Sequence, residues 1–300
     1  MHGRLRRVKE KTEEELNIER VKAGKLKEAG LSVLAKIRSK DYSLEAYQLT
    51  SIMAKLNPDF YTVWNYRKDY LMQRMGNDEK KGFVTALTYS QQDAIQNLMK
   101  KEMELTEDII RNKDPKCYAV WHHRRWVFKQ CPSLLEQREL SLCEALLKLD
   151  QRNFHCWNHW MLICNMMNVS TEERLAFTMK RIEENPSNYS AWHFRCELIN
   201  KTITEANAES VLKEELDLNL NGLYTECDDQ SAWYYLRSLV YLIVKFVKSG
   251  VLAKEKGVAL ISNELEALAE LEEAAPDCIY LTDFKTEIEH LLHTIEWTVS

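Results

Sequence analysis

Residues that break helices are scarce in this chain of 300 residues, which contains only 8 Gly and 5 Pro. Average usage is about 7% Gly and about 5% Pro. The shortage excludes a β-sandwich, a β-barrel and a disordered chain, and it favours a mainly helical protein. With 45% hydrophobic residues, the chain has enough apolar side chain for one or two packed cores.

Long apolar runs and a secretory leader are also missing. The most apolar stretch, residues 238–247, contains Lys245 and is shorter than the ~20 residues that cross a bilayer. Residues 1–9 are basic from Arg4 onward and contain no apolar segment, which excludes a secretory signal. We therefore expect a cytoplasmic protein without a transmembrane segment.

Cysteine pairs and common catalytic motifs are absent too. The 8 Cys form no C-x-x-C pair, so a zinc knuckle or a redox dithiol is not expected, and most should pack as small hydrophobic residues. No H-E-x-x-H, P-loop or G-x-S-x-G motif occurs. Residues 1–27 carry a net charge of +4 and residues 251–300 a net charge of -8, which is no basic footprint for nucleic acid.

What the chain does contain is a repeat, centred on Trp64, Trp121, Trp157, Trp192 and Trp233. The steps between these residues are 57, 36, 35 and 41 positions, and such periods indicate stacked helical hairpins. We place an insertion at residues 76–92 in the long first step. The repeat cores lie near residues 57–71, 114–128, 150–164, 185–199 and 227–241. Residues 276–277, Pro-Asp, suggest a sixth copy that has lost its Trp.

Each copy follows a common pattern with a physical rationale. A Pro stops one helix, and an Asn or Asp beside it caps the next. Tyr, Trp and Arg then follow at i, i+3 and i+6, on one helical face. Because a lone hairpin cannot bury its apolar faces, the copies must stack. The prediction is an all-α fold, a curved α-α superhelix of antiparallel hairpins, with a basic segment at residues 1–27 and a helical-repeat domain at residues 28–300.

The recurrent Trp and Arg are predicted to be structural. A Trp at a fixed repeat position is expected to wedge between adjacent hairpins. The Arg is expected to bond a neighbouring carbonyl or acid. In the third copy Trp160 replaces the Arg, so this copy either satisfies its acceptors in another way or lacks them.

The pattern P-x-N-Y-x-x-W-x-x-R, which extends over roughly residues 45–245, resembles the α subunits of protein prenyltransferases. Its most specific stretches are WHHRRW at residues 121–126 and NFHCW at residues 153–157. Tetratricopeptide repeats have a similar period but lack the Trp-x-x-Arg core. The opening residues, Met1–Arg4, are similar to the Rab geranylgeranyltransferase branch of the family.

This resemblance implies an activity shared with a partner. In the family, the α subunit wraps around a β subunit that holds the isoprenoid and a catalytic zinc. The enzyme joins a geranylgeranyl group from geranylgeranyl diphosphate to a cysteine sulfur and releases diphosphate. In the Rab branch, a Rab escort protein delivers the Rab GTPase. The implied partners are therefore a β subunit and the escort protein with its Rab.

The resemblance also assigns site residues. The family has a Lys five residues before the second-repeat Trp that helps bind diphosphate, and Lys116 stands there. A cation at this place would stabilise the charge that the leaving group gains. Tyr118 and His155 match family residues at the same opening, and Arg152 would add positive charge at the position equivalent to Lys116. Without the resemblance, a solvated loop Lys and a Tyr packed at the repeat turn are the ordinary interpretations.

One position separates the branches of the family. The α subunit shared by farnesyltransferase and type I geranylgeranyltransferase has a Gln after the second-repeat Tyr, which holds the carboxylate of a peptide substrate. Ala119 stands here and cannot do so, which favours the Rab branch. In that branch His2 can approach the zinc, and a disordered basic tail is the alternative. We find no leucine-rich pattern before Ser300 and expect none of the extra modules of some relatives.

Two other functions stay open: the shared farnesyltransferase and type I α subunit, and a non-catalytic scaffold whose groove binds a peptide or helix. His122 and His123 point about 100° apart on a helix, which makes a poor two-ligand metal site. We therefore expect the isolated chain to bind no zinc tightly and to transfer no isoprenoid.

Overall fold

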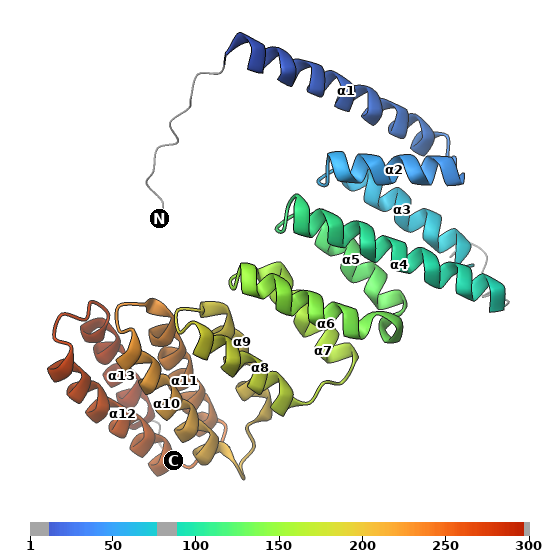
Figure 1. Cartoon of the computed structure of the whole chain (residues 1–300). Helices are drawn as coiled ribbons and strands as arrows, with labels where there is room; N and C mark the ends of the chain where they lie inside the picture. The colour runs from blue at the N-terminus through green and yellow to red at the C-terminus, as the bar shows by residue number, and fades with distance from the viewer. Residues whose placement is uncertain (1–11, 77–88, 297–300) are drawn as a thin grey trace. The chain divides into compact units, whose positions relative to one another are not determined.

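The computed structural model describes residues 12–76 and 89–296, and all regular secondary structure in these ranges is helical (Figure 1). The all-α prediction is therefore confirmed. After a first helix, α1 (Glu13–Arg38), the chain forms six helix pairs. They are α2 (Leu44–Leu56) with α3 (Tyr61–Arg74), α4 (Tyr89–Asn112) with α5 (Tyr118–Gln130), α6 (Pro132–Leu149) with α7 (Phe154–Met166), α8 (Thr171–Glu184) with α9 (Tyr189–Thr202), α10 (Ala208–Thr225) with α11 (Gln230–Lys248), and α12 (Lys254–Ala274) with α13 (Leu281–Glu296).

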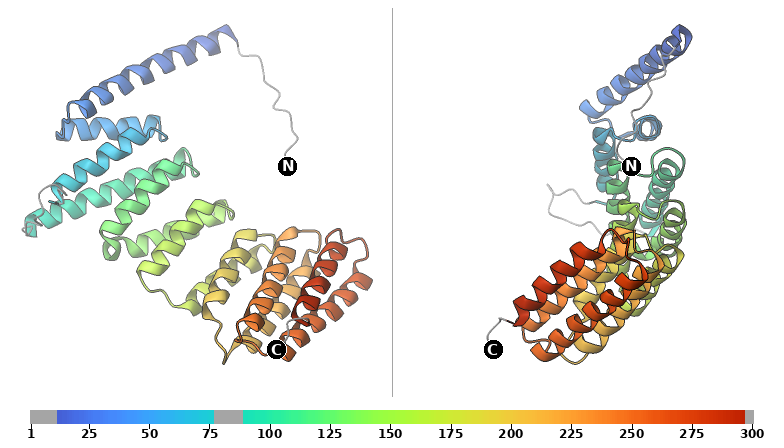
Figure 2. Two further views of the ribbon diagram at one scale, coloured as in Figure 1. Left: turned by 180° about the vertical axis from the view of Figure 1, so that it is seen from behind. Right: turned by 90° about the vertical axis from the view of Figure 1, so that its left-hand side faces the viewer.

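The chain divides into two compact units between Arg138 and Glu139, inside α6. In unit 1, α2 packs on α4 and α3 packs on α5. In unit 2, α10 packs on α12, while α9, α11 and α13 form a second row; Figure 2 shows α10–α13 side by side. Helix α1 runs across positions 27 and 28, so the domain boundary predicted there stays a prediction. Among the described helices, none combines the length and the hydropathy that a membrane span requires.

The same turn joins the two helices of every pair. In each, a backbone N–H donates to the carbonyl three residues earlier, as Cys117 does to Asp114 (3.5 Å) and Cys278 does to Ala275 (3.2 Å). The turns at Asn57, Asp150, Asn185 and Glu226 have the same bond. This register identifies α12 and α13 as the sixth copy and places Thr282 where the other copies have Trp.

The five repeat Trp side chains are at most 2% exposed, and each indole N–H donates to the carbonyl six residues earlier in its own turn. The acceptors are the carbonyls of Pro58, Pro115, Gln151, Pro186 and Cys227, at 2.7–2.8 Å. The ring also packs against the next copy: Trp157 stacks on Phe194, with ring centroids 5.1 Å apart, and Trp192 lies 4.7 Å from Tyr235. The predicted wedge is confirmed, and the indole also fastens the turn.

The repeat Arg side chains bond neighbouring acceptors, as predicted. Arg124 donates to the Met103 carbonyl and to Thr106 Oγ1, both at 2.8 Å. Arg67 makes the same two hydrogen bonds to the Tyr47 carbonyl and Thr50 Oγ1. Arg195 makes them to the Leu175 carbonyl and Thr178 Oγ1.

The fifth copy departs from this pattern. Its Arg237 comes four residues after the Trp instead of three, is 37% exposed, and pairs with Glu287 at 2.9 Å. The buried position three residues after the Trp is Leu236.

Candidate functional site

The turns before α5 and α7 display the two cations that the sequence singled out. Asp114 Oδ1 accepts the backbone N–H of Lys116 (2.9 Å), and Asp150 Oδ1 accepts that of Arg152 (3.1 Å). Both side chains are exposed. Because each backbone is fixed by its own Asp, the two cations hold equivalent places in their repeats. The same position in copies one, four and five holds Asp59, Ser187 and Asp228. Positive charge at this turn is therefore specific to copies two and three.

Arg152 is partly engaged within unit 2. Its guanidinium donates to the Ser187 carbonyl in the next turn and lies 3.9 Å from the Asp229 carboxylate. The side chain is nevertheless 55% exposed. An anion that approaches this turn would therefore compete with Asp229 for the guanidinium.

Exposed aromatic side chains begin four consecutive second helices. Tyr61, Tyr118, Phe154 and Tyr189 are each the first residue of their helix and are 45–62% exposed. Tyr118 is the most exposed of them, at 62%, so the interpretation of this Tyr as packed at the repeat turn is wrong. Tyr61 and Tyr118 form an exposed aromatic edge of unit 1, and Phe154 and Tyr189 form the equivalent edge of unit 2. Large aromatic groups left in solvent at equivalent repeat positions make each edge a candidate contact surface.

His155 lies beneath this edge. Its imidazole is 0% exposed, and its ring centroid is 3.9 Å from that of Phe154. A substrate atom does not reach the imidazole in this arrangement, and the role predicted for it at the opening stays a prediction. Ala119 is also buried, at 1% exposure, so neither its methyl group nor its position offers a hydrogen bond to a peptide carboxylate.

The adjacent His122 and His123 have different environments. His123 is buried and its Nε2 lies 2.7 Å from Glu102, whereas Nδ1 of His122 lies 3.1 Å from Lys68 at the surface. The two rings therefore diverge, as their spacing predicted. His2 lies outside the described residues, as does most of the predicted insertion at residues 76–92.

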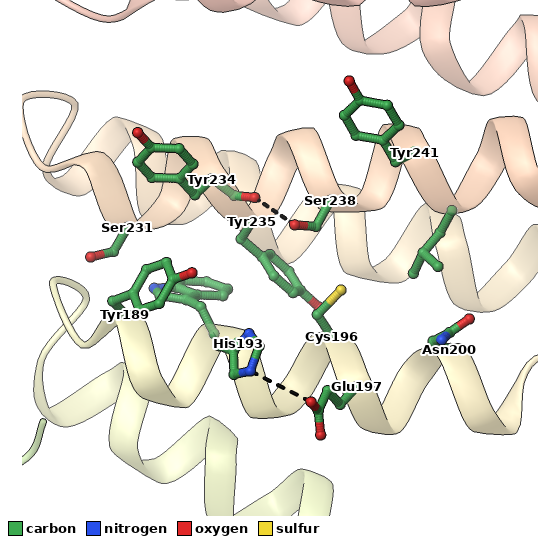
Figure 3. Close-up of a pocket in the computed structure, with 12 residues that line it drawn as sticks. Tyr189, His193, Cys196, Glu197, Asn200, Ser231, Tyr234, Tyr235, Ser238 and Tyr241 are labelled. Atoms are coloured by element: carbon green, nitrogen blue, oxygen red, sulfur yellow. Dashed lines mark hydrogen bonds and ion pairs between the residues drawn. The ribbon is translucent and has the colours of Figure 1, made fainter. Parts of the chain in front are cut away.

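A groove that the sequence analysis did not anticipate lies between α9 and α11 (Figure 3). It has a volume of about 310 Å³ and is lined largely by aromatic side chains. Tyr189, Tyr234 and Tyr241, which line it, stay 39–49% exposed. His193 Nε2, which also lines it, lies 3.5 Å from Glu197 Oε1, and neither of these side chains is buried. The available signal was the spacing of Tyr234 and Tyr241, seven residues apart on one helix face. The groove extends the exposed aromatic edge along unit 2.

Stacked helical hairpins with Trp-fastened turns define a helical-repeat protein, and each of its two units has exposed cations and aromatic side chains at the start of its second helices. Comparison with known families identifies the repeat. The protein prenyltransferase alpha subunit repeat matches residues 39–74, 99–131, 136–167, 171–202 and 212–243. The chain belongs to this family.

Proteins similar to this chain occur in organisms that are distantly related to one another. A geranylgeranyl transferase type-2 subunit alpha from Bos taurus is 35% identical over 80% of this chain, but the match spans only 42% of the bovine protein. Proteins of the same name are 33% identical in Dictyostelium discoideum, where 68% of the relative is covered, and 29% identical in Saccharomyces cerevisiae, where 62% is covered. The chain thus spans less than half the length of its mammalian relatives.

A solved structure shares the fold. A chain of the Candida albicans protein geranylgeranyltransferase-I complexed with GGPP superimposes with a TM-score of 0.59 and 18% identity, over 89% of this chain and 91% of the other.

Proposed function

We propose that this chain is the α subunit of a Rab geranylgeranyltransferase, a cytoplasmic enzyme that is active only as a heterodimer with a prenyltransferase β subunit. The partner would hold the isoprenoid and the zinc. Rab GTPase bound to its escort protein would be the protein substrate. The names of the relatives and the edge of cations and aromatics support this proposal. The free state of all eight Cys agrees with a reducing compartment.

The observation that carries the proposal is the placement of Lys116. Its backbone N–H is bonded to Asp114 at 2.9 Å and its side chain is exposed, and the exposed Tyr118 follows two residues later. In the reaction, the cysteine sulfur forms a bond to the first carbon of the geranylgeranyl chain, and the C–O bond breaks. The diphosphate departs with the electron pair. A cation at its oxygens stabilises this charge more in the transition state than in the ground state.

The other side chains of the edge have supporting roles in this proposal. Arg152 would add positive charge at the next turn, Tyr118 would offer a hydroxyl donor, and His155 would hold Phe154 from beneath. The exposed side chains proposed to contact the substrate, which are Lys116, Arg152, Tyr118 and Phe154, are cationic, phenolic or apolar. They suit a diphosphate and an isoprenoid, and none of them is a preferred zinc ligand. The zinc, which polarises and deprotonates the substrate thiol, is therefore assigned to the β subunit. The approach of His2 to it stays a prediction.

The experiment co-expresses this chain with candidate prenyltransferase β subunits and assays two substrates: Rab with its escort protein, and a short peptide with a C-terminal cysteine motif. Transfer to Rab alone supports the proposal. Transfer to the peptide indicates the α subunit shared by farnesyltransferase and type I geranylgeranyltransferase, an outcome that the buried Ala119 argues against. No stable pairing would leave a non-catalytic scaffold.

Within an active complex, Lys116→Ala should slow transfer by about 10- to 100-fold, which corresponds to roughly 1–3 kcal/mol for the loss of one charged stabiliser. Heterodimer formation should be unchanged. Lys148→Ala, which removes an exposed charge from α6, is the matched control and should leave the rate as it is. If Lys116→Ala is as fast as the wild type in single-turnover assays, Lys116 does not belong to the site.

A further inference from the structure

Three potential metal ligands converge where the turn of the fifth hairpin meets the turn of the sixth. Cys227 and Asp228 come from the turn before α11, and Cys278 from the turn before α13. The Sγ atoms of the two Cys and a carboxylate oxygen of Asp228 all lie within 4.8 Å of one another. Cys278 Sγ also donates to the Cys227 carbonyl at 3.3 Å, which holds the two turns together.

We propose that Cys227, Asp228 and Cys278 bind a zinc ion in this chain. Two thiolates and one carboxylate form a ligand set that Zn²⁺ accepts, with water in the fourth position. Sulfurs bound at 2.3 Å to a tetrahedral zinc lie about 3.8 Å apart. The two sulfurs lie within 4.8 Å of each other, which is compatible with that separation. The exposure of Asp228 and the partial exposure of Cys227 give the ion a path of entry.

The position of the cluster provides a structural reason for the ion. In the first five hairpins, the Trp indole fastens the turn to its helix, but the sixth has Thr282 at that place. Helices α12 and α13 also lie beyond the residues that match the family repeat. A zinc ion that joins Cys278 to the preceding turn would replace the missing indole contact and fix the last hairpin to the fifth.

A second cluster in the chain serves as an internal comparison. Asp59, Asp114 and Cys117 also bring three ligand atoms within 4.8 Å, and Cys117 and Cys278 occupy the same place in the repeat turn. This cluster has only one thiol, which donates to Asp59 Oδ1 at 3.2 Å. Because Zn²⁺ strongly favours thiolate ligands, we assign the ion to the cluster with two.

The inference reverses the expectation that the isolated chain binds no zinc. That expectation relied on the divergence of His122 and His123 and on the lack of a local metal-binding motif, whereas the two Cys here are 51 residues apart in sequence. The proposal is independent of the proposed transferase activity, because the catalytic zinc of that activity is assigned to the partner. It can therefore be tested on the full chain alone.

The test strips the full-length chain of metal, keeps it reduced with a phosphine, and titrates it with Zn²⁺ and separately with Co²⁺. We expect one metal ion per chain by elemental analysis and a thiolate-to-cobalt charge-transfer band. The Cys227→Ser and Cys278→Ser variants should lose both the bound metal ion and the charge-transfer band. The Asp228→Asn variant should bind the metal ion more weakly. Cys117→Ser is the matched control and should bind like the wild type.

A second measurement uses only the wild-type chain, so it does not depend on the folding of the variants. Zinc should protect Cys227 and Cys278 from alkylation, as read by mass spectrometry, and should leave the partly exposed Cys131 reactive. The proposal is overturned if the wild type shows no charge-transfer band. It is also overturned if the band survives in Cys278→Ser, or if Cys227 and Cys278 form a disulfide in place of taking up zinc.

Discussion

At the scale of single residues, the repeat depends on a hydrogen bond that only Trp can provide. The ring fills the space between hairpins, as another large aromatic residue could, but the indole N–H also satisfies a turn carbonyl six residues earlier. A Pro or another residue can supply that carbonyl, since Gln151 and Cys227 do so in copies three and five. The Trp is therefore constant while the turn sequence varies.

We predict that Trp192→Phe destabilises unit 2 by about 1–3 kcal/mol, because the Pro186 carbonyl loses its 2.7 Å donor and the smaller ring leaves a gap. Urea unfolding followed by circular dichroism measures the change. Tyr224→Phe, at a side chain that is 49% exposed, is the control and should alter stability by less than about 0.5 kcal/mol. Equal effects of the two substitutions would show that the indole bond contributes nothing.

At the scale of helices, successive hairpins are joined through a buried glutamate. Glu102 on α4 accepts a hydrogen bond from Nε of Arg67 in the preceding hairpin (3.1 Å). It also lies 2.7 Å from Nε2 of His123 in its own hairpin. Glu215 on α10 is bound in the same way by Arg195 and Tyr235, at 2.7 and 2.6 Å. Glu102 thus connects four helices, since Tyr47 on α2 also donates to it, and Glu215 connects three. Each carboxylate depends on partners from two hairpins.

Between the third and fourth hairpins all three members of this network are replaced together. The third copy has Trp160 for the Arg, and the fourth has Arg174 for the Glu and Phe194 for the His or Tyr. Trp160 stacks on Phe177 with ring centroids 4.4 Å apart, so an aromatic contact takes the place of the ion pair. The carboxylate that the repeat Arg would bind is thus missing from the hairpin that follows the third copy, where Arg174 takes its place. Joint replacement is expected because any one charged member left alone would be buried without a partner.

The charge of Glu102 makes unit 1 sensitive to acid. Burial alone would raise the pKa of this carboxyl, but Arg67 and His123 outweigh it and lower the pKa from 4.5 to about 2. A lowered carboxyl pKa stabilises the fold above pH 4.5, and this contribution is lost as the pH falls toward 2. We therefore predict that the unfolding free energy of unit 1 falls across this interval.

Glu102→Gln tests that prediction by hydrogen exchange in α4 and α5. It should flatten the acid dependence and, by leaving Arg67 buried without its counter-charge, cost roughly 3–5 kcal/mol at neutral pH. Glu104→Gln, at a side chain on the same helix that is 61% exposed, should preserve the wild-type profile. An unchanged acid dependence in Glu102→Gln would place the sensitivity elsewhere.

At the scale of the whole molecule, we predict that one buried carboxyl in each unit contributes to stability with the opposite dependence on pH. Glu264 on α12 holds the place in the sixth copy that Glu215 holds in the fifth, but its partners are gone. Leu236 stands for the Arg and Phe284 for the Tyr. No described residue bonds its buried Oε1. Burial, with a further contribution from Asp217, raises the pKa of Glu264 from 4.5 to about 8.

A raised carboxyl pKa has the reverse consequence for stability. The neutral acid is compatible with the core below pH 4.5, and stability is lost as the pH rises from 4.5 to about 8. We predict that Glu264→Gln stabilises unit 2 at pH 8 by more than about 1 kcal/mol, with the gain shrinking toward pH 4.5. Hydrogen exchange in α12 measures this, and Glu266→Gln, exposed on the same helix, is the control. A gain that is the same at both pH values would contradict the assignment.

The sequence by itself determined the helical hairpins, the turn before each second helix, the buried Trp and the family. These features depend on spacing within one repeat, where 3.6-residue periodicity and the chemistry of Pro, Asn and Asp act locally. It also located Lys116 at a turn and identified Ala119 as unable to bind a carboxylate. These conclusions needed no contact between distant segments.

The tertiary structure decided what each position can do. Glu102 and Glu264 look alike in sequence, yet the pKa of one is lowered to about 2 and that of the other raised to about 8. Likewise, His155 is buried while Tyr118 is exposed, and Cys227 meets Cys278 across 51 residues. Burial and charge pairing are set by side chains that neighbouring hairpins contribute. The sequence of a single repeat does not show which side chains of the next repeat will pack against it.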